Sequence, residues 1–181
     1  KSNGLVEMNP ELENGMRVST KGRVSLEEQA DGSLRVVPHY WQERPDLDAP
    51  FHGVLLDEEA KTNLMNTRHA GKVIDLELEP GKLTPCYVSI DKWTNTLEPM
   101  PVSLLEKRAR IKEADLSEGK QMDFYGGGKV LLEGYTTRAG YKRDAYIQID
   151  AAERNYSFTY DGLDRNRYAQ ENKEIYRQKA A

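Results

Sequence analysis

An internal repeat constrains the fold of this chain more than any other feature of its sequence. The segment 81–91, GKLTPCYVSID, matches the segment 140–150, GYKRDAYIQID, and both close on Tyr, an aliphatic residue, a polar residue, Ile and Asp. Two further blocks match upstream in the same order, 71–73 with 128–130 and 56–58 with 116–118. Three matched blocks in one order predict two similar structural units, with small insertions in the loops between them.

Each repeat is predicted to begin with a short helix. Asp57 and Ser117 are placed as N-caps, since a short side-chain oxygen accepts hydrogen bonds from the free amides of a first helical turn. Acidic residues follow both caps, where they favour the positive end of the helix dipole. The pattern therefore predicts helices over 57–67 and 117–124.

Strands are predicted after each helix, over 72–78 and 129–135. Turns at 79–81 and 138–140 then close hairpins with returning strands, each of which carries an apolar triplet on one face. These triplets are Cys86, Val88 and Ile90 in the first unit and Ala145, Ile147 and Ile149 in the second. A third strand follows in the second unit, whereas the first unit is predicted to be truncated there because Pro99 cannot donate to a sheet ladder.

A separate hairpin precedes the repeats. Strand-like segments over 23–29 and 33–40 flank Asp31-Gly32, which is a strong hairpin signal. Prolines punctuate an extended connector up to residue 50, and a polar, helix-prone tail ends the chain. We therefore divide the chain into an N-terminal segment (1–50), repeat unit 1 (51–101), a basic linker (102–114), repeat unit 2 (115–160) and a polar tail (161–181). The predicted fold class is α+β.

The composition is typical of a folded protein with a thin core. Of the 181 residues, 38% are hydrophobic and 31% are charged, and the formal net charge is −4. No apolar run approaches the roughly 20 residues that cross a bilayer, so no membrane contact is expected. Cys86 is the only cysteine, which excludes an internal disulfide and favours a reducing, cytoplasmic compartment.

Positive charge is concentrated in the second half of the chain. The densest basic run lies over 107–112 and supplies four candidate contacts to nucleic-acid phosphates: Lys107, Arg108, Arg110 and Lys112. The alternative is a solvated linker, which is the commoner fate of a short charge run.

The residue patterns predict no catalytic, metal or cofactor site. The three histidines lack the spacing of paired metal ligands, and Cys86 lies in an apolar alternation where a thiol behaves as a small hydrophobe. The glycine run before Lys129 is not a phosphate loop, because Val130 follows the lysine. Asp91 and Asp150, at matched strand ends, are interpreted as repeated turn caps rather than paired catalytic acids.

Aromatic side chains are the remaining candidates for binding. Three aromatic residues alternate along the third strand of unit 2, and we expect them to pack on the core of that unit: Tyr156, Phe158 and Tyr160. Tyr87 and Tyr146 lie on the faces opposite the apolar triplets. Together with Tyr141, they are predicted to contact a protein or nucleic-acid partner.

One segment carries a resemblance to a known family. Residues 44–53, RPDLDAPFHG, followed by LDEEAK at 56–61, resemble a family of uncharacterised proteins of Bacteroidetes that often sit in conjugative or mobilisable elements. The blocks at 116–118, 128–130 and 146–150 are similar to its repeated C-terminal domain, although the three-glycine turn departs from the family pattern. The resemblance implies a large, modular, intracellular protein near DNA-processing functions, and it carries over no catalytic residue.

These features predict a non-enzymatic accessory binding or scaffold module of a larger intracellular protein. One alternative is a single-stranded nucleic-acid-binding domain that uses strand aromatics and basic residues. A second alternative is an enzyme with a cleft between the repeats, in which Lys72, Lys129, Asp91 or Asp150 would converge.

Overall fold

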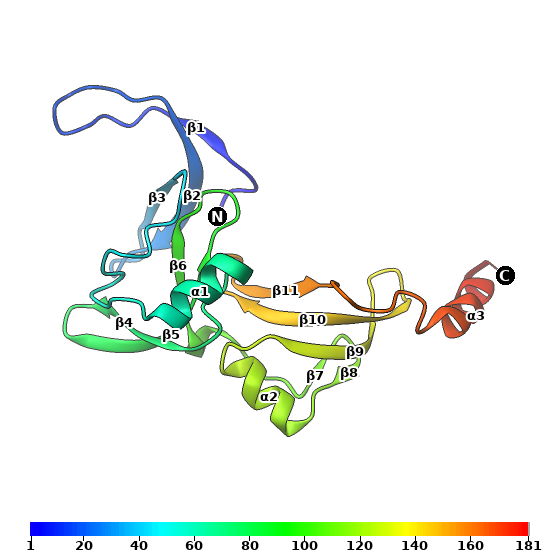
Figure 1. The fold of residues 1–181 in the computed structure, drawn as a ribbon. Helices are drawn as coiled ribbons and strands as arrows, with labels where there is room; N and C mark the ends of the chain where they lie inside the picture. The colour runs from blue at the N-terminus through cyan, green and yellow to red at the C-terminus, as the bar shows by residue number, and fades with distance from the viewer. Residues whose placement is uncertain (181) are drawn as a thin grey trace.

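The computed structural model describes residues 1–180 and has an α+β fold (Figure 1). Within these residues, three antiparallel three-stranded sheets and one two-stranded hairpin combine with three α-helices. The predicted fold class is confirmed. No helix in this part of the chain is long and apolar enough to cross a membrane.

The N-terminal sheet contains three strands in chain order, β1 (Val6–Met8), β2 (Thr20–Glu28) and β3 (Leu34–Tyr40). The predicted hairpin joins β2 to β3, and Asp31 Oδ1 accepts a hydrogen bond from the Ser33 amide at 2.9 Å. β1 pairs with the other edge of β2 over only three residues, too few for an alternating pattern to reveal it.

The two repeats have the same order of elements. Unit 1 contains α1 (Glu58–Thr67), β4 (Ile74–Glu79), β5 (Lys82–Ile90) and β6 (Leu97–Pro101). Unit 2 contains α2 (Glu118–Tyr125), β9 (Val130–Thr136), β10 (Lys142–Asp150) and β11 (Asn155–Thr159). Between them lie a 3₁₀ turn, η1 (Val102–Leu104), and the short strands β7 (Arg110–Ile111) and β8 (Ala114–Asp115). The chain ends in α3 (Ala169–Ala180).

Both predicted N-caps are confirmed. Asp57 Oδ1 accepts a hydrogen bond from the Ala60 amide at 2.9 Å, and Ser117 Oγ accepts one from the Lys120 amide at 3.4 Å. Both helices therefore begin at the predicted residues because the cap satisfies an amide that lacks a partner within the helix.

The prediction that the third strand of unit 1 is truncated before Pro99 is wrong. β6 pairs with β5 from Ile90 opposite Leu97 to Cys86 opposite Pro101. It contains two prolines, but it is an edge strand, where a missing N–H on the outer side breaks no ladder bond. Each unit is thus one helix and a three-stranded meander.

The segment predicted as a basic linker takes part in the fold of unit 2. β7 and β8 form a hairpin whose two turn residues, Lys112 and Glu113, have positive φ angles of 46° and 67°. Positive φ at both central residues is the geometry of a type I′ turn, which normally favours Asn and Gly. The flanking Ile111 and Ala114 are buried, so this hairpin adds to the core of unit 2.

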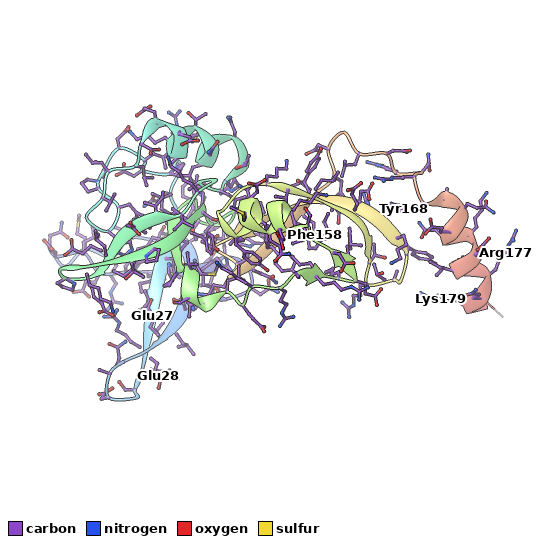
Figure 2. All side chains as sticks on the ribbon, turned by 90° about the horizontal axis from the view of Figure 1, so that it is seen from below. Glu27, Glu28, Phe158, Tyr168, Arg177 and Lys179 are labelled. Carbon is purple, nitrogen blue, oxygen red and sulfur yellow. The ribbon has the colours of Figure 1, made fainter. Side chains whose placement is uncertain are left out.

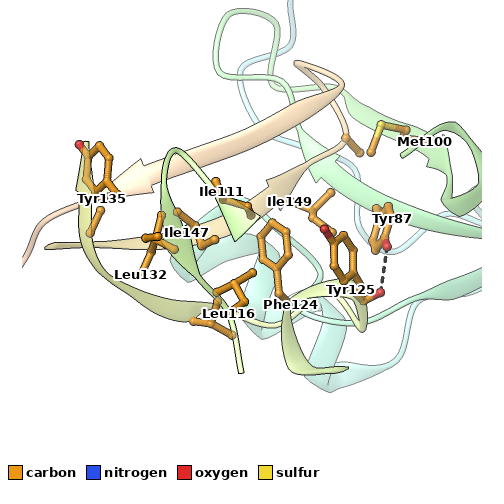
Figure 3. Close-up of a cluster of buried hydrophobic side chains, with 14 residues drawn as sticks. Tyr87, Met100, Ile111, Leu116, Phe124, Tyr125, Leu132, Tyr135, Ile147 and Ile149 are labelled. Atoms are coloured by element: carbon orange, nitrogen blue, oxygen red, sulfur yellow. Dashed lines mark hydrogen bonds between the residues drawn. The ribbon is translucent and has the colours of Figure 1, made fainter. Parts of the chain in front are cut away.

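Two apolar cores share the strand β5. Its Cys86, Val88 and Ile90 face α1 and form the core of unit 1 with residues such as Leu64 and Leu76. Its Tyr87 points to the other side and packs in the core of unit 2 (Figure 3). All residues of β5 from 86 to 90 are buried.

Tyr87 was predicted to contact a partner, and the structure contradicts this. Its ring is only 2% exposed, and its hydroxyl donates a hydrogen bond to the Tyr125 carbonyl at 2.8 Å (Figure 3). The alternation of β5 correctly separates its two faces. It does not reveal that unit 2 covers the second face, because that contact joins residues far apart in the sequence.

The polar tail docks on unit 2 through a few contacts. Asn172 bonds both the amide and the carbonyl of Lys142, at 2.7 and 3.0 Å. Tyr168 donates a hydrogen bond to Asp144 at 2.8 Å, and Lys179 bonds the Ala139 carbonyl. No residue of α3 is buried, so these polar contacts at the β9–β10 turn position it (Figure 1).

His69 lies beside β5, where it forms a bridge with Ser89, and it joins the two units. Its Nδ1 lies 2.9 Å from Ser89 Oγ in unit 1, and its Nε2 lies 3.2 Å from Ser157 Oγ in unit 2. Burial lowers the pKa of the imidazole below its usual value, an effect that Arg68 and Lys129 reinforce and Asp150 opposes. The folded chain therefore holds His69 neutral at a pH where the unfolded chain protonates it.

This difference predicts a loss of stability in mild acid. The unfolded state takes up a proton below about pH 6.5 and the folded state does not, so the free energy of unfolding falls as the pH drops, by at most about 1.4 kcal/mol per pH unit. Chemical unfolding between pH 7.5 and 5.5 measures this slope. His69→Gln should flatten it, whereas His52→Gln, at an exposed position, should leave it unchanged. An equal slope in the His69 variant would contradict the assignment.

Candidate functional site

The N-terminal sheet has two chemically different faces. The register places Val24 opposite Pro38 and Leu26 opposite Val36 on one face, which we call the outer face. On the other, inner face lie polar and charged residues, which include Arg23, Ser25 and His39. An apolar face on a small sheet normally packs against a core. Here the charged face is turned towards the repeats instead.

Asp91, at the end of β5, holds the inner face to unit 1. Its Oδ2 lies 2.6 Å from Arg23 Nη1 and 3.3 Å from Lys1 Nζ. Asp91 is fully buried and Arg23 is 5% exposed. The same guanidinium nitrogen lies 3.2 Å from Glu153 in unit 2. One buried arginine therefore connects the sheet to both repeats.

The other oxygen of Asp91 caps the turn after β5. Asp91 Oδ1 accepts hydrogen bonds from the amides of Trp93 at 2.8 Å and Thr94 at 3.3 Å. Asp150 forms the same turn in unit 2, accepting from Ala152 and Glu153 at 3.0 and 3.1 Å. The prediction of a repeated turn cap is confirmed.

The charge of Asp91 is stabilised although it is buried. Burial by itself raises the pKa of this carboxyl, but the Trp93 amide and the charges of Lys1 and Arg23 outweigh it. The pKa of Asp91 consequently lies below its usual value. The stabilisation is present above the pKa of the unfolded chain and is lost as the pH falls through the folded pKa.

A second polar chain crosses the same junction. His39 Nδ1 lies 3.0 Å from Glu98 Oε1, and His39 Nε2 lies 2.8 Å from Ser25 Oγ. Burial opposes ionisation of Glu98, but hydrogen bonds from His39 and Lys1 prevail and lower the pKa of its carboxyl. The sequence did not predict that these three residues meet, since Glu98 is distant in the chain from the other two.

The order serine, histidine, carboxylate is that of a hydrolase triad. Two features favour an anchoring role instead. Glu98 Oε2 is held by Lys1 at 2.7 Å, so its charge is already shared with a lysine. Ser25 lies in the middle of β2, whereas the nucleophile of α/β-hydrolases stands on a sharp turn. We interpret this chain of contacts as a further attachment of the sheet to unit 1.

A cavity of about 660 Å³ lies at this junction. Its lining comes from the N-terminal sheet, from β6 and from the turn at 151–154 of unit 2, and its charged groups include Arg23, Glu98 and Arg154. Leu26, Pro38 and Tyr40 also border it, so the outer face meets the cavity at its rim. The ionic groups of the cavity are largely paired with each other, as the contacts above show. Within residues 1–180, no group of three or more His, Cys, Asp and Glu side chains is arranged to hold a metal ion.

The outer face is exposed apolar surface. Leu26, Leu34 and Val36 are 65%, 64% and 60% exposed, and Tyr40 at the end of β3 is 40% exposed. Figure 2 shows the hairpin that carries Glu27 and Glu28 extending away from the repeats. Ten of the seventeen large apolar side chains exposed in the described residues lie within 1–50. Contiguous apolar surface of this kind marks interaction sites.

The remaining predicted contact residues lie apart from this face. Tyr146 and Tyr141 are half-buried on unit 2, with Lys129 Nζ 4.9 Å and Lys179 Nζ 5.2 Å from their ring centroids. Tyr156, Phe158 and Tyr160 pack against the unit 2 core, as predicted.

The four basic residues of 107–112 are exposed but locally engaged. Arg108 pairs with Glu106 at 2.6 Å and Arg110 with Asp115 at 3.5 Å. Lys107 lies over the ring of Tyr125, and Lys112 lies over the rings of Tyr135 and Phe158.

The residues that the enzyme alternative requires in one cleft have different partners in the structure. Lys72, which lies between α1 and β4, pairs with Asp57 and Glu59 at the start of α1, at 2.6 and 2.7 Å. Asp91 is buried beneath the N-terminal sheet, and Lys129 lies over Tyr146.

Two segments match known family models. Residues 1–50 match a family described as a protein of unknown function (DUF4099), and residues 108–161 match one described as a protein of unknown function (DUF3945). The chain therefore contains two domains of unknown function. Comparison with curated proteins and with solved structures gave no match.

Asp91→Asn should separate the two roles of this carboxylate. The amide oxygen still caps the turn, but Arg23 loses its main counter-charge while buried, so we expect a loss of about 3 kcal/mol in the free energy of unfolding. Asp150→Asn is the matched control, because the same turn lacks the Arg23 contact, and it should cost less than about 1 kcal/mol. Denaturant unfolding measures both losses, and equal values would contradict the anchoring role of Asp91.

Proposed function

We propose that this chain is a non-enzymatic protein-binding module of scaffold type, in which the outer face of the N-terminal sheet receives a protein partner. The observation that carries the proposal is the exposure of Leu26, Leu34 and Val36 on one face of a paired sheet. The inner face is fixed to the repeats by Arg23 and His39, so the outer face is held in a defined position.

The energetics suit a moderate-affinity interface. Burial of a whole aliphatic side chain stabilises a complex by about 1.5–3 kcal/mol. Leu26, Leu34 and Val36 are about two-thirds exposed, so burial of the exposed part of each side chain contributes about 1–2 kcal/mol. Leu26, Leu34 and Val36 together therefore supply about 3–6 kcal/mol, a large part of the roughly 8 kcal/mol of a micromolar complex, before the cost of association. A partner is better received by the outer face than by strand addition at the edge of β3. Pro38 lies in β3 and has no backbone N–H, so it interrupts the row of hydrogen-bond donors that an added strand needs.

Other features of the sequence fit this role. The resemblance of residues 44–61 to modular proteins of Bacteroidetes mobile elements suits an accessory component near DNA-processing machinery. The single free cysteine, Cys86, is buried, which suits a cytoplasmic setting. Nucleic-acid binding receives less support, because the basic run at 107–112 is largely engaged by nearby acidic and aromatic groups.

Site-specific photo-crosslinking in cells that encode this chain tests the proposal. A photoreactive residue at position 36 should give a discrete protein adduct, because the partner covers the outer face. The same residue at position 58, on an exposed polar helix position, is the matched control and should give none. Leu26→Asp should abolish the adduct at position 36, because an unpaired charge opposes burial.

Three results would contradict the proposal. These are equal adducts from both positions, an adduct that persists with Leu26→Asp in a chain of unchanged circular dichroism, and an adduct that nuclease removes. The last result would favour the nucleic-acid alternative.

A further inference from the structure

One row of side chains supplies apolar packing between unit 1 and unit 2, beside the polar contacts of His69, and we call it the Tyr87 row: Val73, Tyr87 and Met100. Tyr87 and Met100 are directly opposite in the β5–β6 register, and Val73 precedes Ile74, whose partner on β5 is Cys86. Tyr87 and Met100 are buried in the core of unit 2, and Val73 packs against it. The Tyr87 row thus lies on the sheet of unit 1, but its side chains are buried in the core of unit 2.

Unit 2 covers this row with the end of its helix and the glycine turn that follows. The Tyr125 carbonyl accepts the hydrogen bond of the Tyr87 hydroxyl at 2.8 Å. A Cβ atom on Gly127 would lie 2.9 Å from the Lys72 nitrogen, and Gly127 has a φ of +97°. The three-glycine turn therefore permits a close approach of the two backbones, which a side chain at this position would prevent.

The same row exists on unit 2 and is not covered in the same way. Tyr146 is opposite Thr159 on β11 and opposite Leu131 on β9, and we call these three residues the Tyr146 row. The shared pattern, YVSID in unit 1 and YIQID in unit 2, places Tyr146 where unit 1 has Tyr87. All three side chains of the Tyr146 row are only half-buried.

Hydrogen bonds and ion pairs flank the Tyr146 row on both sides, but within residues 1–180 its own three side chains form none. Towards unit 1, Ser157 contacts His69, and towards the tail, Arg167 and Tyr168 bind Asp144. Lys129 lies over the Tyr146 ring with its exposed side chain. Thr159 Oγ1 is the one buried side-chain polar atom in residues 1–180 that lacks a hydrogen-bond partner.

We propose that the Tyr146 row is a docking seam for a further unit of the same helix-plus-three-strand kind, joined in tandem. The incoming unit would cover the row as unit 2 covers the Tyr87 row, and the carbonyl at its Tyr125 position would accept from the Tyr146 hydroxyl. The argument rests on continuity with the interface between units 1 and 2, since repeat arrays reuse one nearest-neighbour interface. It is independent of the partner proposed for the N-terminal sheet.

A lengthened chain tests the seam. It consists of residues 1–160, a second copy of 102–160 with Tyr146→Phe in that copy, and residues 161–181. Tyrosine nitration with peptide mapping then reports the accessibility of the original Tyr146 alone. In the 181-residue chain Tyr146 should react, whereas in the lengthened chain it should lose reactivity to the level of the buried Tyr87. Tyr176, which is 63% exposed, is the internal reference and should react in both chains.

Two variants connect this protection to the row. Leu131→Asp in unit 2 of the lengthened chain should restore the reactivity of Tyr146, since a charge at the seam opposes docking. Thr159→Met, which supplies the residue type of Met100, should raise the melting temperature of the lengthened chain and not that of the 181-residue chain.

The proposal is overturned if Tyr146 reacts equally in both chains. It is also overturned if the added copy shows no amide protection by hydrogen exchange, because docking on the row should complete its core. Protection of Tyr146 in the 181-residue chain that grows with protein concentration would assign the seam to a second copy of the chain and would also overturn the tandem arrangement.

Discussion

Burial of β5 on both faces is the constraint on which the rest of the structure depends. In a small antiparallel sheet one face usually packs on a core and the other meets water. Here Val88 and its neighbours complete the core of unit 1, while Tyr87 completes that of unit 2. The second unit therefore has no complete core without the first. Because β5 packs on both faces, one strand contributes apolar side chains to two cores in a chain that has few of them.

The end of β5 also anchors the N-terminal sheet. Asp91 caps the turn with one oxygen and pairs with Arg23 through the other, so a single buried carboxylate combines a local and a long-range role. Because the sheet is attached through its charged face, its apolar face is left outside. This inversion of the usual arrangement is the physical basis for our proposal that a partner contacts Leu26 and Val36 rather than the aromatic residues of the repeats.

Local interactions in this fold could be predicted from the sequence, and contacts between units could not. The caps at Asp57 and Ser117, the hairpin at Asp31-Gly32 and the alternating strands all depend on neighbours within a few residues. Tyr87 was misjudged because alternation shows which face a side chain takes and not what covers that face.

The candidate site was missed for a related reason. Asp91 and Asp150 occupy equivalent turns, and nothing in their local sequence shows that only Asp91 meets Arg23. The exposed Leu26 and Val36 alternate as core residues do, so the pattern cannot show that the opposite, charged face is the one that packs. β6 was missed because its prolines are tolerated only at an edge, and the position of an edge is a property of the whole sheet.

Native-state hydrogen exchange on the full chain tests the central claim most directly, because amides in one cooperative unit exchange with one opening free energy. If β5 serves both cores, the amides of β5 and of β10 should form a single slowest class and respond together to added denaturant. Separate classes, with β10 still protected when β5 has opened, would contradict the account.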